Sequence, residues 1–108
     1  MKPDVARSWE IALRRLRKAR EHAVAGEDDA AIREAKGAVV DGVIAITLLL
    51  RDDDRRTWQA ALDDVSDDSF VNWDSCVSAH DYVEKASKTL THFANLSPPE
   101  SKLPPPDA

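Results

Sequence analysis

Cysteine, glycine and aromatic residues are scarce in this chain of 108 residues. Its one cysteine, Cys76, excludes an intramolecular disulfide and a zinc site built from several cysteines. Proteins of reducing compartments lack disulfides, so we expect a cytoplasmic location. Three glycines and few aromatic residues are unlike an all-β domain, which needs many turns. These scarcities together favour a helical fold.

Long hydrophobic stretches are also missing. The longest apolar run, residues 43–50, is interrupted by Thr47, and a bilayer-spanning helix needs about 20 apolar residues. Residues 1–9 contain no apolar segment of the kind that marks a signal peptide. We therefore expect no association with a membrane.

Charge is unevenly distributed along the chain. The formal net charge of −5 argues against a protein that binds nucleic acid by overall attraction. Residues 1–20, however, contain seven Lys or Arg and two acidic residues, whereas residues 21–68 contain five and thirteen. The basic segment is either a solvated helix face or an interaction surface for phosphates or an acidic partner. Its candidate residues are Arg14, Arg15, Arg17 and Lys18.

Four segments carry apolar residues at spacings of three and four, the period of an amphipathic α-helix. We predict long helices over residues 4–25, 29–51 and 72–96, and a short one over about 52–65. The second segment is the most hydrophobic, so we expect it to lie at the centre of the fold. The fold class predicted is all-α, an antiparallel up-and-down four-helix bundle with three long helices and one short.

Capping and stop signals set the expected helix ends. Asp4 is expected to cap the first helix and Gly26 to end it. Asp28 and Asp29 place negative charge at the start of the second helix, and residues 52–54 are three aspartates that can cap the third. The tight connections near Gly26 and residue 52 favour antiparallel neighbours.

The last segment, residues 97–108, contains five of the six prolines. Proline cannot continue a helix and favours the extended polyproline II conformation. We therefore expect one helical domain over residues 1–96, followed by a disordered Pro-rich tail.

Small residues on the second helix predict a close approach of another backbone, because glycine lowers helix stability by about 1 kcal/mol relative to alanine. The neighbour is either a helix of the same chain or a second copy, and a homodimer is our expectation. The residues of this close-packing or dimer face are Gly37, Gly42 and Ala45.

Three other residues form a candidate buried polar site: Asp41, Cys76 and His80. Cys76 and His80 are four residues apart, so on one helix they could bind a metal or form a nucleophile–base pair. The alternative is that both are ordinary core residues. Asp41 is either a buried carboxylate in a cleft or a boundary residue paired with an arginine of the first helix, near residues 12–15.

No sequence motif of a phosphate-binding loop, a zinc protease or a cysteine nucleophile is present. We therefore assign no catalytic residue, no cofactor and no metal ligand from the sequence. An enzymatic activity is less expected than a binding role.

The order of the segments resembles the HEPN superfamily of small helical domains in prokaryotes. The resemblance covers residues 5–96. It rests on the long first helix, the apolar second helix ending in L-L-L (residues 48–50) and the final helix with A-H-D-Y-V-E-K-A (residues 79–86). Many HEPN proteins are RNases or toxins that use an R-x4-6-H motif near the last long helix, usually completed across a dimer.

This chain departs from that motif, because no arginine follows Arg56. The only matching spacings join Arg15 and Arg17 to His22 in the first helix. The resemblance then implies a non-enzymatic interaction or assembly module, of a prokaryotic stress or toxin–antitoxin type system, whose partner is itself or another protein. The alternatives are an RNA-binding or RNA-cleaving toxin that uses the basic first helix, and a small-ligand or metal-binding bundle.

Overall fold

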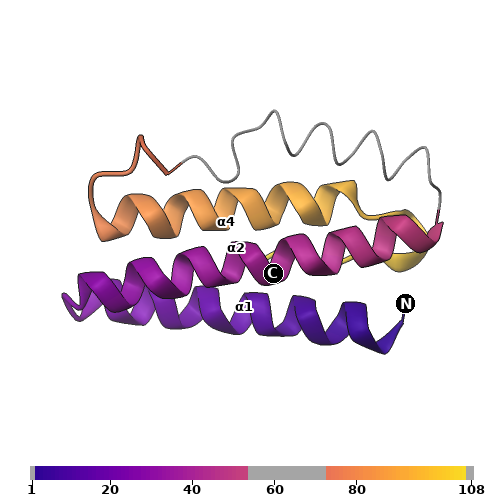
Figure 1. The fold of residues 1–108 in the computed structure, drawn as a ribbon, viewed down its shortest axis with the longest axis horizontal. Coiled ribbons are helices and arrows are strands. Elements are labelled where there is room, and N and C mark those ends of the chain that lie inside the picture. Colours follow the sequence, from indigo (N-terminus) through magenta and orange to yellow (C-terminus); the bar gives the residue numbers. More distant parts are fainter. Residues whose placement is uncertain (1, 54–72, 107–108) are drawn as a thin grey trace.

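A computed structural model describes residues 2–53 and 73–106 of the chain. In these two ranges the chain forms three α-helices and one short 3-10 helix, and no strand (Figure 1). The helices are α1 (Pro3–Val24), α2 (Asp28–Asp53) and α4 (Ala79–Leu96), followed by η1 (Pro99–Ser101). The all-helical class is confirmed. The bundle shows three of the four predicted helices. The predicted short helix lies outside the described residues, apart from Asp52 and Asp53, which belong to α2.

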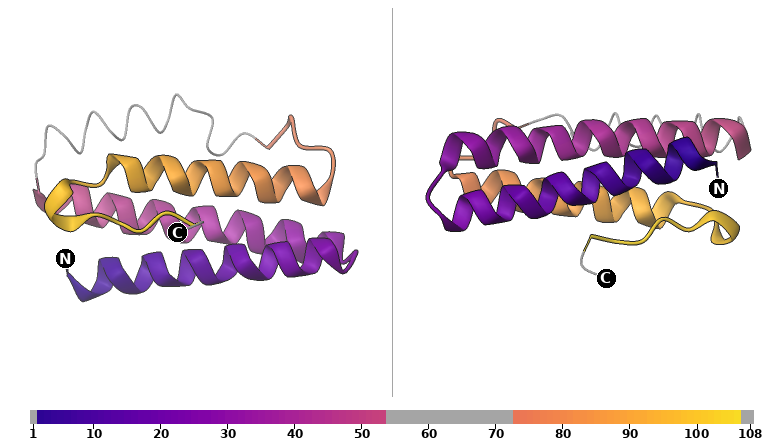
Figure 2. Two further views of the ribbon diagram at one scale, coloured as in Figure 1. Left: turned by 180° about the vertical axis from the view of Figure 1, so that it is seen from behind. Right: turned by 90° about the horizontal axis from the view of Figure 1, so that it is seen from below.

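The helices lie side by side with α2 in the middle (Figures 1 and 2). α1 runs antiparallel to α2, as the tight turn at Gly26 predicts, and α4 runs in the same direction as α2. α2 packs extensively against both α1 and α4, whereas α1 and α4 meet less closely. The prediction that the most hydrophobic segment is central is therefore confirmed.

One face of each helix supplies the core, at the helical spacing predicted from the sequence. Many of these residues are alanines, so the helix backbones approach closely and the few large side chains fill the space between them. Each fully buried large side chain contributes roughly 1.5–3 kcal/mol. The buried residues of the cluster in α1 and α4 are Val5, Trp9, Ala12, Leu16, Ala19, Val83, Ala86, Leu90, Phe93 and Ala94.

Of the two predicted ends of α1, only the C-terminal one agrees with the structure. Gly26 has φ +79°, the left-handed conformation that glycine adopts without strain, and it follows the last turn as predicted. At the other end the cap is Lys2, with Pro3 as the first helical residue, so the prediction of Asp4 as the cap is wrong. The fixed φ of proline suits the first helical position, and its missing N–H has no helical partner there in any case.

α4 begins at Ala79, seven residues later than predicted. The Ser78 hydroxyl accepts a hydrogen bond from the Asp81 N–H (3.2 Å), and the Asp81 carboxylate accepts one from the Ser78 N–H (3.1 Å), which is a capping box. The Val77 N–H also donates to Asp81 (3.0 Å). These bonds from Val77 and Ser78 hold the pKa of Asp81 below its ordinary value of 3.8. The capping box sets the start of the helix at Ala79, although the apolar repeat in the sequence continues back to Trp73.

Residues 97–106 are part of the fold, so the prediction of a disordered tail is wrong for them. After η1 the chain turns back along the bundle on the side of α1 and α4 that faces away from α2 (Figure 2). Leu103 is fully buried in the core cluster, and the indole N–H of Trp9 donates a hydrogen bond to the carbonyl oxygen of Pro104 (2.8 Å). The extended φ and ψ of Pro98 (−66°, 152°) agree with the predicted polyproline II conformation.

Candidate functional site

The outward side of α2 presents apolar side chains to solvent. Val40 and Ile44 lie one helical turn apart and are 58% and 45% exposed. Val43 and Thr47 lie beside them and are half-buried. We call Val40, Val43, Ile44 and Thr47 the α2 outer face. Exposed apolar residues that gather on one helix face in this way are typical of a contact surface.

Sequence reasoning missed this face. The signal is nonetheless present in the composition of α2, because residues 38–50 contain more apolar residues than one side of a helix can hold. From the sequence we take that excess only as evidence of a central place in the bundle. The structure packs two sides of α2 against α1 and α4, and Val40 and Ile44 on the third side are exposed.

The small residues of α2 pack inside this chain. A Cβ atom added at Gly42 would collide with the Leu90 side chain and would lie 3.3 Å from Cδ2 of Phe93, both on α4. Ala45 is completely buried. The close-packing interpretation is therefore correct for Gly42 and Ala45. The dimer-face interpretation is wrong for them, because α4 of the same chain covers Gly42 and no surface of Ala45 remains exposed.

Gly37, the third small residue, makes room for Arg15 of α1. A Cβ atom at Gly37 would collide with the Arg15 guanidinium, which lies across α2 at this point. Nε of Arg15 is 3.2 Å from Oδ2 of Asp41, one turn further along α2. This oxygen receives no hydrogen bond, so the contact is an ion pair without hydrogen-bond geometry. The prediction that Asp41 pairs with an arginine of the first helix is confirmed.

We expect Asp41→Asn to lower the free energy of unfolding by less than about 1 kcal/mol. The side chain of Asp41 is 20% exposed and that of Arg15 is 45% exposed, so water screens the pair in part, although Oδ2 of Asp41 is itself buried. Urea unfolding of the wild type and the variant, followed by circular dichroism, measures the difference. A loss of about 3–5 kcal/mol would instead identify Asp41 as one partner of a truly buried charge pair.

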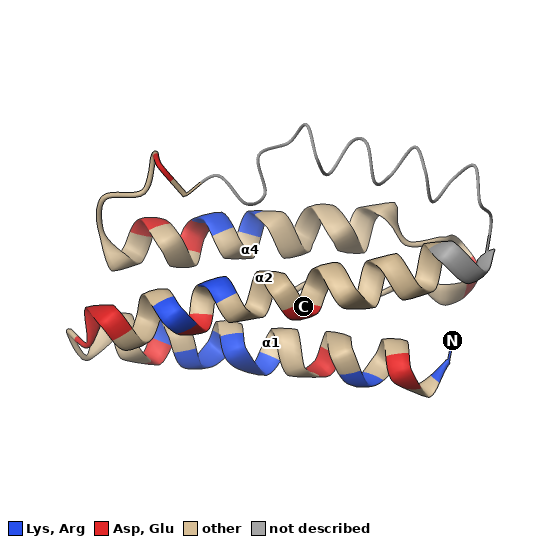
Figure 3. Ribbon diagram, viewed as in Figure 1, with Lys and Arg blue, Asp and Glu red and all other residues tan. Residues whose placement is uncertain are grey.

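The basic residues of α1 do not act as one surface. Arg14, Arg17 and Lys18 are exposed, and the band of Lys and Arg is visible along α1 in Figure 3. Arg15 is turned toward Asp41 on α2 and leaves this group. Arg14 lies 3.8 Å from Glu10, a helical i,i+4 pair. All four predicted cations are therefore exposed, and one of them, Arg15, is paired with Asp41.

The candidate polar site of Asp41, Cys76 and His80 is not assembled. Cys76 precedes α4, so it does not share a helix with His80, and His80 is exposed and not on the apolar face. Asp41 faces α1. Among residues 2–53 and 73–106, no group of three His, Cys, Asp or Glu side chains is placed to hold a metal ion.

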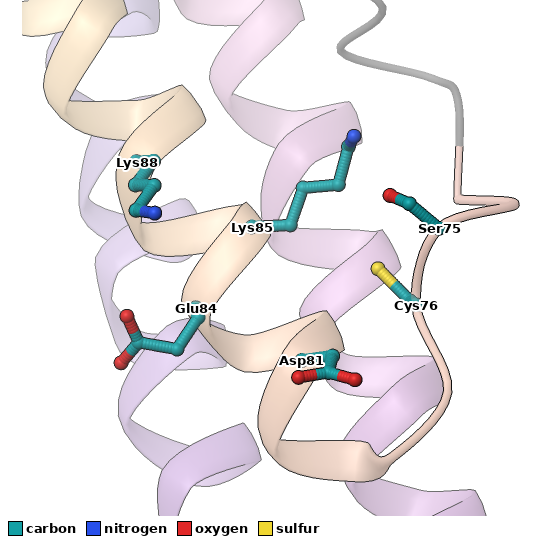
Figure 4. A pocket seen from close by; sticks show the side chains of 6 residues that line it. All are labelled: Ser75, Cys76, Asp81, Glu84, Lys85 and Lys88. Carbon is teal, nitrogen blue, oxygen red and sulfur yellow. The ribbon is translucent and has the colours of Figure 1, made fainter.

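Cys76 instead lines an open hollow between its loop and the first turns of α4 (Figure 4). Its thiol points toward α4, where Asp81 is already engaged by the capping box. The hollow has acidic and basic side chains in equal number, which gives no preference for a charged ligand. The lining residues are Ser75, Cys76, Asp81, Glu84, Lys85 and Lys88.

The R-x6-H spacing in α1 also lacks the geometry of a catalytic pair. Arg15 forms an ion pair with Asp41, and Nδ1 of His22 lies 3.3 Å from Oε1 of Glu27 in the turn after α1. Each residue thus has a separate acidic partner.

No α-helix within the described part of the chain is long and apolar enough to cross a membrane. Comparisons of the chain with protein-family models, with curated proteins and with solved structures gave no match. The argument about function therefore rests on the surfaces described above.

Proposed function

We propose that this protein is a non-enzymatic helical interaction module that pairs with a second copy through the α2 outer face. The observation that carries the proposal is the exposure of Val40 and Ile44 on the helix that otherwise forms the centre of the core. Removing such apolar surface from water is favourable by roughly 25 cal/mol per Å². A second copy offers the same face, and a two-fold axis would bury both faces at once.

The same proposal includes a HEPN-like origin and a role in a prokaryotic stress or toxin–antitoxin type system. The support is the order of a long α1, an apolar α2 and a final α4 that contains the A-H-D-Y-V-E-K-A segment. No arginine precedes either histidine of α4 at the spacing that HEPN nucleases use. Assembly in the cytoplasm, with itself or with another protein, is then the activity that we propose.

RNA binding is a second candidate, favoured by exposed cations on α1 that include Arg14, Arg17 and Lys18. Side chains of this kind bind phosphates without reading sequence. The test is an RNA-binding and RNA-cleavage assay of the wild type beside Arg17→Ala and His22→Ala. If the wild type neither binds nor cleaves RNA, this candidate is removed.

We expect the wild type to have the mass of two copies in light scattering after size exclusion, and the double variant Val40→Lys, Ile44→Lys to have the mass of one copy, 12.0 kDa. Two lysines on the α2 outer face would place like charges against each other across the two-fold axis. The matched control is Val24→Lys with Val77→Lys, because both valines are 91% exposed and lie outside this face.

The control variant should remain a dimer. A wild type that stays a monomer of 12.0 kDa at all concentrations would refute the dimer. A double variant that still pairs would place the interface elsewhere on the molecule.

A further inference from the structure

The segment that follows α4 lies on the bundle like a bound peptide. It leaves α4 at Ser97, turns through η1 and returns in extended conformation along α1 (Figure 2). It lies over the side formed by α1 and α4, the two helices that contact each other least. Leu103 of this segment is buried in the core cluster to which both helices contribute.

The bundle recognises this segment through two features. The first is an apolar slot in which Leu103 is fully buried, as part of the same cluster as Val5, Trp9 and Phe93. The second is the indole N–H of Trp9, which donates a hydrogen bond to the carbonyl oxygen of Pro104 (2.8 Å). An aromatic donor suits a proline-rich segment, because prolines have no N–H and offer only carbonyl oxygens as hydrogen-bonding groups.

Two side chains of residues 102–105 hold the segment: Leu103 enters the slot, and Nζ of Lys102 donates to the carbonyl oxygens of Asn95 and Ser97 (3.5 Å each). Leu103 is buried, whereas Lys102, Pro104 and Pro105 are exposed. The backbone of Leu103 is satisfied within the segment itself, since its N–H donates to the Ser97 hydroxyl (2.9 Å) and the Ser97 hydroxyl donates to the carbonyl oxygen of Ala94. The contacts that come from the helices are therefore the slot, the Trp9 donor and the Asn95 carbonyl oxygen, and none of them requires the occupant to belong to the same chain.

We propose that this slot is a docking site for extended segments of other proteins that carry an aliphatic residue followed by prolines. Residues 102–106 are then an internal competitor that an incoming segment displaces. The occupant present in the structure defines the chemistry of the partner. This docking site is separate from the α2 outer face, so the proposal stands whether or not the protein forms a dimer.

The experiment uses the full chain and a fluorescent peptide of residues 97–108, with binding followed by fluorescence polarisation. A tethered segment competes at an effective concentration on the order of millimolar. Leu103→Asp releases it, because a carboxylate does not enter an apolar slot. We expect the Leu103→Asp protein to bind the peptide at least about tenfold more tightly than the wild type does.

Three controls sharpen this experiment. The same peptide with Leu103→Asp should not bind. Adding Trp9→Phe to the Leu103→Asp protein should weaken binding about fivefold, because it removes one hydrogen-bond donor and keeps an aromatic ring in the slot. Ser97→Ala releases the segment more gently and keeps the core intact, so it is the variant to use if Leu103→Asp does not fold, as judged by circular dichroism.

Absence of saturable peptide binding to either folded variant would overturn the proposal, as would equal binding by the wild type and the variants. If the segment is instead exchanged between two copies, the wild type would show a concentration-dependent dimer that Leu103→Asp abolishes, with no gain of peptide binding. That result would also overturn it.

Discussion

Trp9→Ala is expected to lower the free energy of unfolding by about 3–5 kcal/mol. Trp9 is 2% exposed and belongs to the core cluster that joins α1, α2 and α4. Its removal leaves a cavity in that cluster. The loss also breaks the hydrogen bond to Pro104, which fastens residues 97–106 to α1. Urea unfolding followed by far-ultraviolet circular dichroism measures the change.

Two further variants separate these contributions. Trp9→Phe keeps most of the apolar contact and removes the N–H donor, so it should cost about 1 kcal/mol for the hydrogen bond and a smaller cavity term in addition. Val24→Ala is the surface control, because Val24 ends α1 and is 91% exposed, and its effect should stay within about 0.5 kcal/mol. A Trp9→Ala protein as stable as the Val24→Ala protein would contradict the core that we describe.

Gly42→Ala is expected to destabilise the protein, although alanine is the better helix former by about 1 kcal/mol. The new methyl group would collide with Leu90 and press on Phe93, both completely buried on α4. Overpacking of this kind costs typically about 1–3 kcal/mol, and neither side chain can move into solvent. The steric cost exceeds the gain in helix propensity, so the net loss should reach about 1–2 kcal/mol by thermal or urea unfolding.

Gly37→Ala is the matched control, because it makes the same change in the same helix. The group in its way is the Arg15 guanidinium, the end of a flexible and half-exposed side chain that can move into water. We therefore expect Gly37→Ala to be as stable as the wild type or more stable. Equal effects of the two substitutions would show that α4 does not pack against Gly42 as closely as described.

Local signals predicted much of the helical framework. The spacing of Trp9, Leu16 and Ala19 defines the buried side of α1, and Gly26 marks its end, because both depend on residues that lie near one another in the sequence. The pairing of Asp41 with an arginine of the first helix also followed, since the short turn at Gly26 fixes which levels of two antiparallel helices meet. The resemblance to HEPN proteins stays a prediction.

The start of α4 shows where periodicity misleads. Trp73, Cys76 and Val77 continue the apolar repeat of α4 backwards, yet the chain there forms a turn in which the Cys76 N–H donates to the Trp73 carbonyl oxygen. The capping box at Ser78 and Asp81 was readable in the sequence as S-x-x-D before an apolar run. The capping signal therefore predicts the start of α4 better than the apolar repeat does.

By itself, the sequence determined that the chain is helical, which residues of α1 face inward, and that α2 is central. Each of these depends on patterns within one or two turns of helix. Only the tertiary structure decided that Leu103 is buried and that Val40 and Ile44 of α2 are exposed. The first depends on Trp9 and Pro104, 95 residues apart, and the second on how α1 and α4 divide the surface of α2 between them. Such contacts join distant parts of the chain, and no local pattern encodes them.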